Sequence, residues 1–445
     1  VGRAGLFGVQ RGASAVWLWS SVAFYHVGLV ARLTAKLLWF LLTGTKTWVF
    51  MSARLMLFVV LLLPGLLQML AYWLLDPTVI KNVPYTRRGA KDRNLLDIYL
   101  PPGEDGVRGA PPRTKRPVFI FFTGGAWVIG YKLWGALMAK TFSENNVVAV
   151  VPDVRNFPQG KLDDMLDDVD SAVRWVLRHI GKYGGDPSHV VLAGQSAGAH
   201  LAAMAMLRQA RLQQAGRDVR WSPAGMVGFA GISGPYDLPL LESHLHKRGL
   251  DSSILRWISD NDLQRYSPLQ NVPVDCSGLP PVWLYHGESD ATIPVSITLR
   301  FAAALEASGA KVTARTFLDW THTEPILEGP LSGDDSLCHD ILQSLLEETS
   351  CESLLKGPSN EEDPFSDDDD APSASRGARE RPEALLSPPR RNGGEAFGAA
   401  EVDLTARPQH LPRRLSSLPT AVPRARCEPL VHPSLVAVAR KVNPF

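Results

Sequence analysis

Short apolar runs bounded by turn residues recur through the middle of the chain. They cover residues 117–122, 147–152, 189–193, 226–232 and 282–286. Runs of this length and composition predict strands that are buried on both faces, as in a parallel sheet. Between several of the runs, apolar residues recur about every 3.6 positions, as at Leu162, Met165, Leu166, Val169, Val173 and Val176. Strands alternating with amphipathic helices predict an α/β fold with a mostly parallel central sheet and helices on both of its faces.

The N-terminal region has a different pattern, dominated by Leu, Val, Trp, Phe and Ala. Residues 55–75 contain no charged side chain, and a helix rising about 1.5 Å per residue over that length crosses a hydrocarbon core of roughly 30 Å. The pattern predicts one transmembrane helix at 55–75, with weaker candidate spans at 15–31 and 37–50. Basic residues are more frequent just after the strongest span than before it, which favours a cytosolic location for the region that follows.

Beyond residue 350 the chain becomes rich in Pro, Ser and charged residues, with consecutive aspartates at 367–370. A segment of this composition buries too little apolar surface to offset the entropy that it loses on ordering. We therefore divide the chain into three parts. They are a membrane-anchoring region at 1–80, a folded α/β domain at 81–350 and a disordered tail at 351–445.

Charge and cysteine content exclude several classes of protein. The 445 residues include 46 Lys and Arg against 45 Asp and Glu, and the resulting net charge of +1 provides no overall field for binding nucleic acid. The cysteines, at positions 276, 338, 351 and 427, lack the paired spacing of a zinc site and do not form a disulfide framework. We expect no metal site and a reducing compartment.

The most informative motif is Gly194-Gln195-Ser196-Ala197-Gly198, which stands directly after an apolar run and directly before a helical stretch. G-x-S-x-G in that context is the nucleophile elbow, a turn so tight that the positions two before and two after the serine have no room for a side chain. The turn presents the Ser196 hydroxyl at the carboxyl edge of the sheet. The amide of Ala197, at the start of the helix, is a candidate donor to an oxyanion.

A serine hydroxyl becomes a strong nucleophile only when a base takes its proton, so a carboxylate and a histidine should follow in the order Ser, Asp, His. Asp290 follows an apolar run, and His322 follows a strand-like stretch at 312–318. Both therefore lie in loops at the edge of the sheet where Ser196 emerges. We predict Ser196 as the nucleophile, His322 as the general base and Asp290 as its orienting carboxylate. The nearest rivals are His286, Glu288 and Asp319.

A glycine-rich loop, Thr123-Gly124-Gly125-Ala126-Trp127, directly follows the apolar run at 117–122. Small residues let backbone amides approach a developing oxyanion closely. We expect this loop to form the second half of an oxyanion hole, with Gly125 and Ala126 donating beside Ala197. Taken alone, two glycines after a strand would also fit an ordinary turn.

These motifs resemble the hormone-sensitive-lipase-like carboxylesterases of the α/β-hydrolase superfamily, although Thr123 and Ala126 depart from the usual H-G-G-G loop of that group. Within the superfamily, residues 84–330 resemble the isoprenylcysteine methylesterase family. The stretches that carry this resemblance are residues 124–132, 155–160, 184–187, 194–200, 244–250 and 321–323.

The resemblance implies an α/β-hydrolase fold and hydrolysis of the methyl ester of a C-terminal prenylated cysteine, which gives a carboxylate and methanol. It also implies an integral protein of the endoplasmic reticulum or Golgi membrane, because members of the family carry N-terminal membrane segments. The expected partners are prenylated protein C-termini or prenylcysteine methyl esters and the lipid bilayer, with no nucleic acid, metal or cofactor. Because a prenyl chain partitions into the bilayer, an esterase tethered there meets its substrate at a high effective concentration.

The segment 238–266 lies between two predicted core strands and combines an apolar helical face with histidines and an arginine. We interpret it as a cap that lines a lipid-accepting pocket; a packed pair of surface helices is the alternative. The candidate substrate contacts are Trp127, His244, His246 and Arg248. For the function itself, the alternatives are another membrane-bound carboxylesterase or lipase, an arylformamidase-like hydrolase, and a catalytically inactive scaffold.

Overall fold

The structure is a computed structural model that describes residues 46–86, 93–102, 115–355 and 429–445. The candidate span at 15–31, residues 37–45 of that at 37–50, and most of the predicted disordered tail lie outside these residues. The chain separates into two compact units. One combines residues up to Leu63 with Pro433–Pro444, and the other, called the larger unit below, comprises Pro64–His432.

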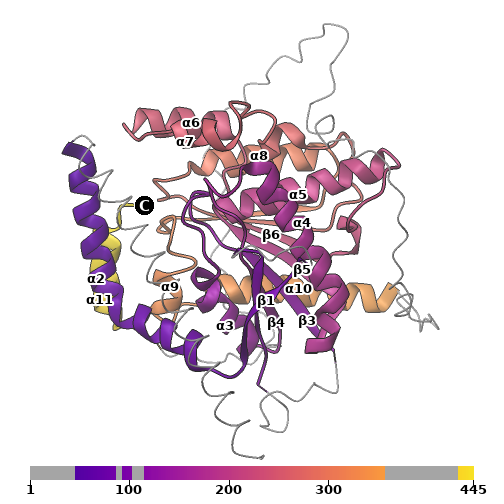
Figure 1. The fold of residues 1–445 in the computed structure, drawn as a ribbon, viewed down its shortest axis with the longest axis horizontal. Coiled ribbons are helices and arrows are strands. Elements are labelled where there is room, and N and C mark those ends of the chain that lie inside the picture. The colour runs from indigo at the N-terminus through magenta and orange to yellow at the C-terminus, as the bar shows by residue number, and fades with distance from the viewer. Residues whose placement is uncertain (1–45, 87–92, 103–114, 356–428) are drawn as a thin grey trace, which may run out of the picture. The chain divides into compact units, whose positions relative to one another are not determined.

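The larger unit is built on an eight-stranded sheet (Figure 1). Its strands are β1 (Val79–Pro84), β2 (Leu95–Tyr99), β3 (Arg116–Phe122), β4 (Val148–Pro152), β5 (Gly185–Gln195), β6 (Gly228–Ile232), β7 (Val282–Gly287) and β8 (Val312–Phe317). They lie in the order β1-β2-β4-β3-β5-β6-β7-β8. Strand β2 is antiparallel to both of its neighbours, and all other pairs are parallel. The predicted mostly parallel α/β fold is therefore confirmed, while β1 and β2 were not predicted.

The order of the strands fixes where the helices lie. From β3 the chain moves outward through α3 (Ala136–Glu144) to β4, and then returns past β3 through α4 (Leu162–His179) to β5. Because crossovers between parallel strands are right-handed, this change of direction puts α3 and α4 on opposite faces of the sheet. A crevice opens at the carboxyl ends of the strands where such a reversal occurs, and ligands of open α/β sheets bind there.

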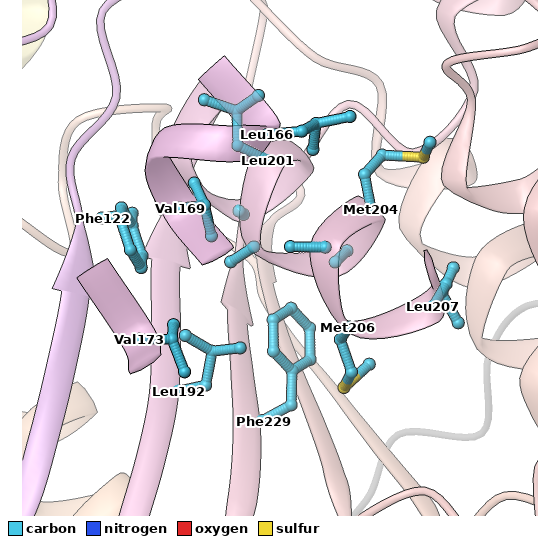
Figure 2. Close-up of a cluster of buried hydrophobic side chains, with 14 of the residues drawn as sticks. Phe122, Leu166, Val169, Val173, Leu192, Leu201, Met204, Met206, Leu207 and Phe229 are labelled. Carbon is cyan, nitrogen blue, oxygen red and sulfur yellow. The ribbon is translucent and has the colours of Figure 1, made fainter. Parts of the chain in front are cut away.

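Helices α4 and α5 (Ala197–Gln214) pack against the sheet below this edge. The predicted apolar positions of α4 are all completely buried. Figure 2 shows Val169 and Val173 of α4 beside Phe122 of β3 and Leu192 of β5. This packing holds the carboxyl ends of β3 and β5, which carry the glycine-rich loop and the serine, in a fixed arrangement.

The remaining helices of the larger unit follow β6 and the later strands. They are α6 (Leu238–Lys247), α7 (Ser253–Ile258), α8 (Val295–Ala307), α9 (Glu328–Leu331) and α10 (Ser336–Leu355). Short 3₁₀ turns occur elsewhere in the unit: η1 (Lys132–Gly135), η2 (Ile180–Tyr183), η3 (Pro223–Gly225) and η4 (Pro268–Asn271). Helices α6 and α7 lie within the segment predicted to be a cap. Helix α10 continues beyond the predicted domain boundary at residue 350.

The smaller unit contains the first part of α2 (Lys46–Leu75) and the C-terminal helix α11 (Pro433–Val442). Arg54 joins α2 to the end of α11, since its Nε donates to Val442 O at 3.2 Å and its Nη2 to Asn443 O at 2.7 Å. The prediction of disorder from 351 to 445 is therefore wrong for α11. Val436 and Ala439, three residues apart, give this short helix an apolar stripe, and both side chains are buried.

Helix α2 is longer than the predicted span at 55–75. Its segment Ser52–Leu75 is long and apolar enough to cross a membrane. The core helix of a soluble protein can have the same length and composition.

Candidate active site

Ser196 occupies a strained turn between β5 and α5. Its backbone has φ 54° and ψ −124°, a conformation that non-glycine residues rarely adopt. A Cβ added to Gly194 would lie 2.5 Å from the carbonyl carbon of Gly198, and one added to Gly198 would lie 2.0 Å from Phe122 O. The two glycines of the motif therefore have no room for a side chain, and the turn projects Ser196 from the carboxyl edge of the sheet.

Ser196, His322 and Asp290 form one hydrogen-bonded array, and all three side chains are almost completely buried. Ser196 Oγ lies 2.9 Å from His322 Nε2, and His322 Nδ1 lies 2.7 Å from Asp290 Oδ2. A carboxylate can only accept, so Nδ1 carries the hydrogen and Nε2 accepts the hydrogen bond that the serine hydroxyl donates. The structure thus brings together the three residues predicted as a triad. The rivals Glu288 and Asp319 are exposed and lie outside the array.

The Asp290 carboxylate has donors on both oxygens. Oδ1 accepts hydrogen bonds from Thr292 N at 2.8 Å and Ile293 N at 2.9 Å. Burial acts to raise the pKa of Asp290, but the charge of His322 and hydrogen bonds from His286 and His322 outweigh it and hold that pKa well below its usual value. The carboxylate therefore stays ionised, and only an ionised carboxylate can stabilise an imidazolium by its charge.

His286, which the sequence prediction ranked only as a rival, lies beside the Asp290 carboxylate. It is completely buried, and its Nε2 lies 2.9 Å from Ile293 O and 3.3 Å from Asp290 Oδ2. Its Nδ1 lies 2.7 Å from Thr298 Oγ1. A hydrogen on Nε2 satisfies both oxygens, and the threonine hydroxyl then donates to Nδ1. The available signal was the position of His286 on β7, four residues before the acid.

The glycine-rich loop runs through three consecutive residues with positive φ: Gly125 (131°), Ala126 (48°) and Trp127 (60°). The tight turn is closed by Ile129 N, which donates to Gly125 O at 2.9 Å. Among the described residues, no backbone carbonyl accepts a hydrogen bond from the amides of Gly125 or Ala126. Ala197 is the first residue of α5, where an amide has no partner within its helix. These three amides are thus the candidate oxyanion donors.

Gln195 joins the loop to the triad. Its Nε2 donates to His322 O at 3.2 Å, and a Cβ on Gly124 would lie 2.2 Å from its Oε1. The absence of a side chain at Gly124 therefore lets the loop lie directly against the buried Gln195. The sequence motif identified both residues but not this contact.

A second buried histidine, His200, supports Trp127. Trp127 Nε1 donates to His200 Nδ1 at 3.2 Å, and His200 Nε2 donates to Tyr266 O at 2.7 Å. Burial lowers the pKa of His200 to about 4, with a smaller opposing effect of the hydrogen bond to Tyr266, so the ring is neutral near pH 7. The Trp127 indole is consequently directed into the protein, and His200 is a positioning residue that sequence reasoning missed.

The predicted contacts from the cap have structural partners. His244 Nε2 donates to Ala291 O at 3.0 Å, and Arg248 Nη1 donates to the same oxygen. Burial lowers the pKa of Arg248, and the nearby Asp290 opposes this shift. His246 is exposed. The end of α6 is therefore attached to the loop that carries the triad acid.

The fold and the Ser-His-Asp array together define a class, the α/β-hydrolases with a serine hydrolase arrangement. The BD-FAE family model matches residues 96–305. Esterase B from Lactobacillus rhamnosis has a similar fold, with a TM-score of 0.52 and 18% sequence identity over 68% of this chain and 98% of that one.

Two curated plant proteins are more similar in sequence. The isoprenylcysteine alpha-carbonyl methylesterase of Arabidopsis thaliana is 37% identical over 71% of this chain and 73% of its own length. A probable isoprenylcysteine alpha-carbonyl methylesterase of Oryza sativa subsp. japonica is 39% identical over 71% of this chain and 73% of its own length. The chain belongs to the isoprenylcysteine alpha-carbonyl methylesterase family, and the family predicted from the sequence motifs is confirmed.

Proposed function

We propose that this protein hydrolyses the methyl ester of a C-terminal prenylated cysteine, with Ser196 as nucleophile, His322 as general base and Asp290 as its orienting carboxylate. The observation that carries the proposal is the buried array in which Ser196 Oγ lies 2.9 Å from His322 Nε2 and His322 Nδ1 lies 2.7 Å from Asp290. Membership of a family whose curated members are named for this activity supports the choice of substrate.

In the first step, Ser196 Oγ attacks the ester carbonyl carbon while His322 Nε2 takes the hydroxyl proton. The negative charge that develops on the carbonyl oxygen is stabilised by the amides of Gly125, Ala126 and Ala197. The tetrahedral intermediate then collapses, and His322 gives the proton to the departing methoxide. Methanol leaves, and the acyl group remains on the serine oxygen.

In the second step, a water molecule attacks the acyl-enzyme. His322 takes a proton from the water, and the same amides stabilise the second tetrahedral intermediate. Collapse returns the proton to Ser196 Oγ and releases the prenylcysteine carboxylate. One ester and one water thus give one carboxylic acid and one methanol, and the enzyme is restored.

The cap supports a lipid substrate. Helix α6 is attached to the loop of the triad acid through Ala291, and Trp257 of α7 stacks on Phe157 with ring centroids 6.3 Å apart. Phe157 N in turn donates to Trp127 O in the glycine-rich loop. Helix α6 is thus bonded directly to one side of the site, and α7 reaches the other side through Phe157. Trp127, His244, His246 and Arg248 are the proposed residues around the prenyl chain.

Membrane attachment through α2 fits the same substrate. We place the protein in the endoplasmic reticulum or Golgi membrane with the site facing the cytosol, where prenylated protein C-termini lie. Protease protection of the site-bearing unit in intact vesicles would contradict that orientation.

Turnover of farnesylcysteine methyl ester by the full-length protein in lipid nanodiscs tests the function. We expect release of the carboxylate, and a loss of several orders of magnitude in Ser196→Ala with folding unchanged. A short p-nitrophenyl ester, assayed in parallel, reports the bare esterase chemistry. Activity confined to the short ester would reject the prenylcysteine substrate and leave a different esterase. Equal turnover by Ser196→Ala would reject the mechanism.

A further inference from the structure

The last three turns of α2, residues 64–75, belong to the larger unit and contain no charged side chain. A helix that is apolar on every side is normally enclosed, either in a protein core or in a membrane. These turns are enclosed on one side only, which raises the question of what covers the other.

The inner side packs on the folded domain through Gly65, Met69 and Trp73, all of them buried. A Cβ on Gly65 would lie 2.5 Å from the Val431 side chain, so the domain contacts the helix backbone there. Trp73 Nε1 donates to Asp97 Oδ2 at 2.7 Å, and both side chains are buried. These turns are therefore a fixed part of the larger unit.

The outer side is apolar and exposed. Leu67 is 55% exposed, Leu74 36% and Leu75 79%. Ala71 is exposed between them, so the residues at 67, 71 and 74 form one stripe along the helix. Large exposed side chains of this kind, gathered on one face, mark a surface that is covered in the working protein.

Two more apolar residues of the larger unit are exposed, Ile129 (49%) and Trp134 (44%). Tyr131 connects them to α2: its ring lies 6.5 Å from that of Trp73, and its carbonyl accepts from Trp134 N at 3.0 Å. Trp134 Nε1 donates to the backbone carbonyl of Ile129 at 3.2 Å, which holds the indole beside residue 129. Ile129 follows the glycine-rich loop, which ends at Trp127, by two residues, so this surface borders the active site.

Two lysines accompany the same end of α2. Lys81 Nζ donates to Trp73 O at 3.0 Å and Leu74 O at 3.1 Å, and Lys140 Nζ lies 5.7 Å from the centre of the Tyr72 ring. Tryptophan, tyrosine and lysine side chains together are typical of the level of lipid headgroups, where rings are half-immersed and cations face phosphates.

We propose that the outer side of residues 64–75, with Ile129 and Trp134, is a lipid-docking surface that rests at the boundary between headgroups and acyl chains. These turns do not span the hydrocarbon, because their inner side carries a folded domain with the buried ion pair Asp97–Lys132, which cannot enter it. They lie half-submerged instead, as interfacial helices do. The proposal deepens the membrane attachment proposed above and is independent of the identity of the ester.

Depth measurements on the full-length protein in phosphatidylcholine–phosphatidylserine vesicles test this surface. Cysteine replaces Leu67, Leu74 or Trp134 in a background with Cys351→Ser and Cys427→Ser, and each carries an NBD fluorophore. Val274→Cys is the matched control, because Val274 is 93% exposed and lies before β7, at the opposite edge of the sheet from the site. We expect blue-shifted emission and quenching by shallow spin-labelled lipids at all three test positions, and water-like emission at 274.

Two results would overturn the proposal. Water-like emission at position 134 would show that the larger unit stands away from the lipid. Quenching of position 67 only by spin labels near the bilayer centre, with position 74 much shallower, would show that the turns cross the membrane.

A second measurement asks whether docking serves the site. The variant Leu67→Gln/Trp134→Gln should lose about tenfold in turnover of p-nitrophenyl palmitate held in vesicles, because less enzyme is correctly docked. Its turnover of soluble p-nitrophenyl acetate should be unchanged, as should both activities of Val274→Gln. Equal losses on the two esters, or none on the vesicle-held one, would contradict the proposed role. If the unsubstituted protein showed no esterase activity at all, the proposed function would be rejected. The depth measurements would still test the docking surface.

Discussion

The ion pair beneath α2 predicts a large and specific loss of stability in Lys132→Met. Lys132 Nζ lies 2.5 Å from both Asp97 Oδ1 and Asn82 Oδ1, and the side chains of the charged pair are 2% and 0% exposed. Asp97 also accepts from Trp73 Nε1 at 2.7 Å and Asn82 N at 2.8 Å. The substitution leaves these neutral donors in place but removes the only cation bonded to the carboxylate among the described residues.

Removing one partner of a buried ion pair costs about 3–5 kcal/mol, because the other charge remains buried without compensation. For a folded unit of this size that corresponds to a fall in Tm of roughly 6–20 °C. The chain offers a matched control in Lys140→Met, which removes the cation of the surface pair Lys140–Glu144, four residues apart on α3. Surface pairs contribute only about 0–1 kcal/mol, so this variant should melt within a few degrees of the unsubstituted protein.

Thermal unfolding of the full-length protein in one detergent, followed by intrinsic fluorescence, measures both changes. The double variant Asp97→Asn/Lys132→Met should recover a substantial part of the lost Tm, because an amide has no charge to bury. Similar melting of Lys132→Met and Lys140→Met would refute the reasoning, and so would a double variant that is less stable than Lys132→Met alone.

Three further predictions concern the site. Gly198→Ala places a Cβ 2.0 Å from Phe122 O, so we expect little folded protein. The soluble yield and the cooperative melting of detergent extracts measure this. A well-folded, active variant would contradict the geometry. His286→Phe removes a hydrogen bond to Asp290, and we expect kcat to fall roughly 10–100-fold, while His286→Gln, which keeps a donor, recovers part of the activity. Equal losses in the two variants would contradict a role for that donor. The pKa of His200 is lowered to about 4 in the folded state. The free energy of unfolding should therefore have its full value above about pH 6.5 and fall by about 3 kcal/mol as the pH drops to 4. His200→Gln should lack this dependence of Tm on pH.

The parts of the fold that were predictable are those in which local pattern and burial agree. The parallel core strands are continuous apolar runs because both faces are covered, and α4 shows its buried face directly in its periodicity. Strand β2 was missed because Asp97 interrupts its apolar pattern. The partner that makes a buried aspartate acceptable there is Lys132, 35 residues further along the chain, and only the folded structure brings the two together.

The same distinction holds for the site. Ser196, Asp290 and His322 were predictable because the chemistry dictates their order and the strand ends dictate their positions. The contribution of His286 depends on Thr298, which approaches it from the next helix, and that of His200 depends on Trp127 and Tyr266. Helix α11 was missed because its ten residues are too few to alter the average composition of a long polar segment.

One backbone hydrogen bond near residue 445 links two parts of the larger unit that are far apart in the sequence. Val431 N donates to Leu331 O at 2.9 Å, so the chain just before α11 is attached to the end of α9. A single proteolytic cut between residues 355 and 429 would therefore leave two fragments that still associate.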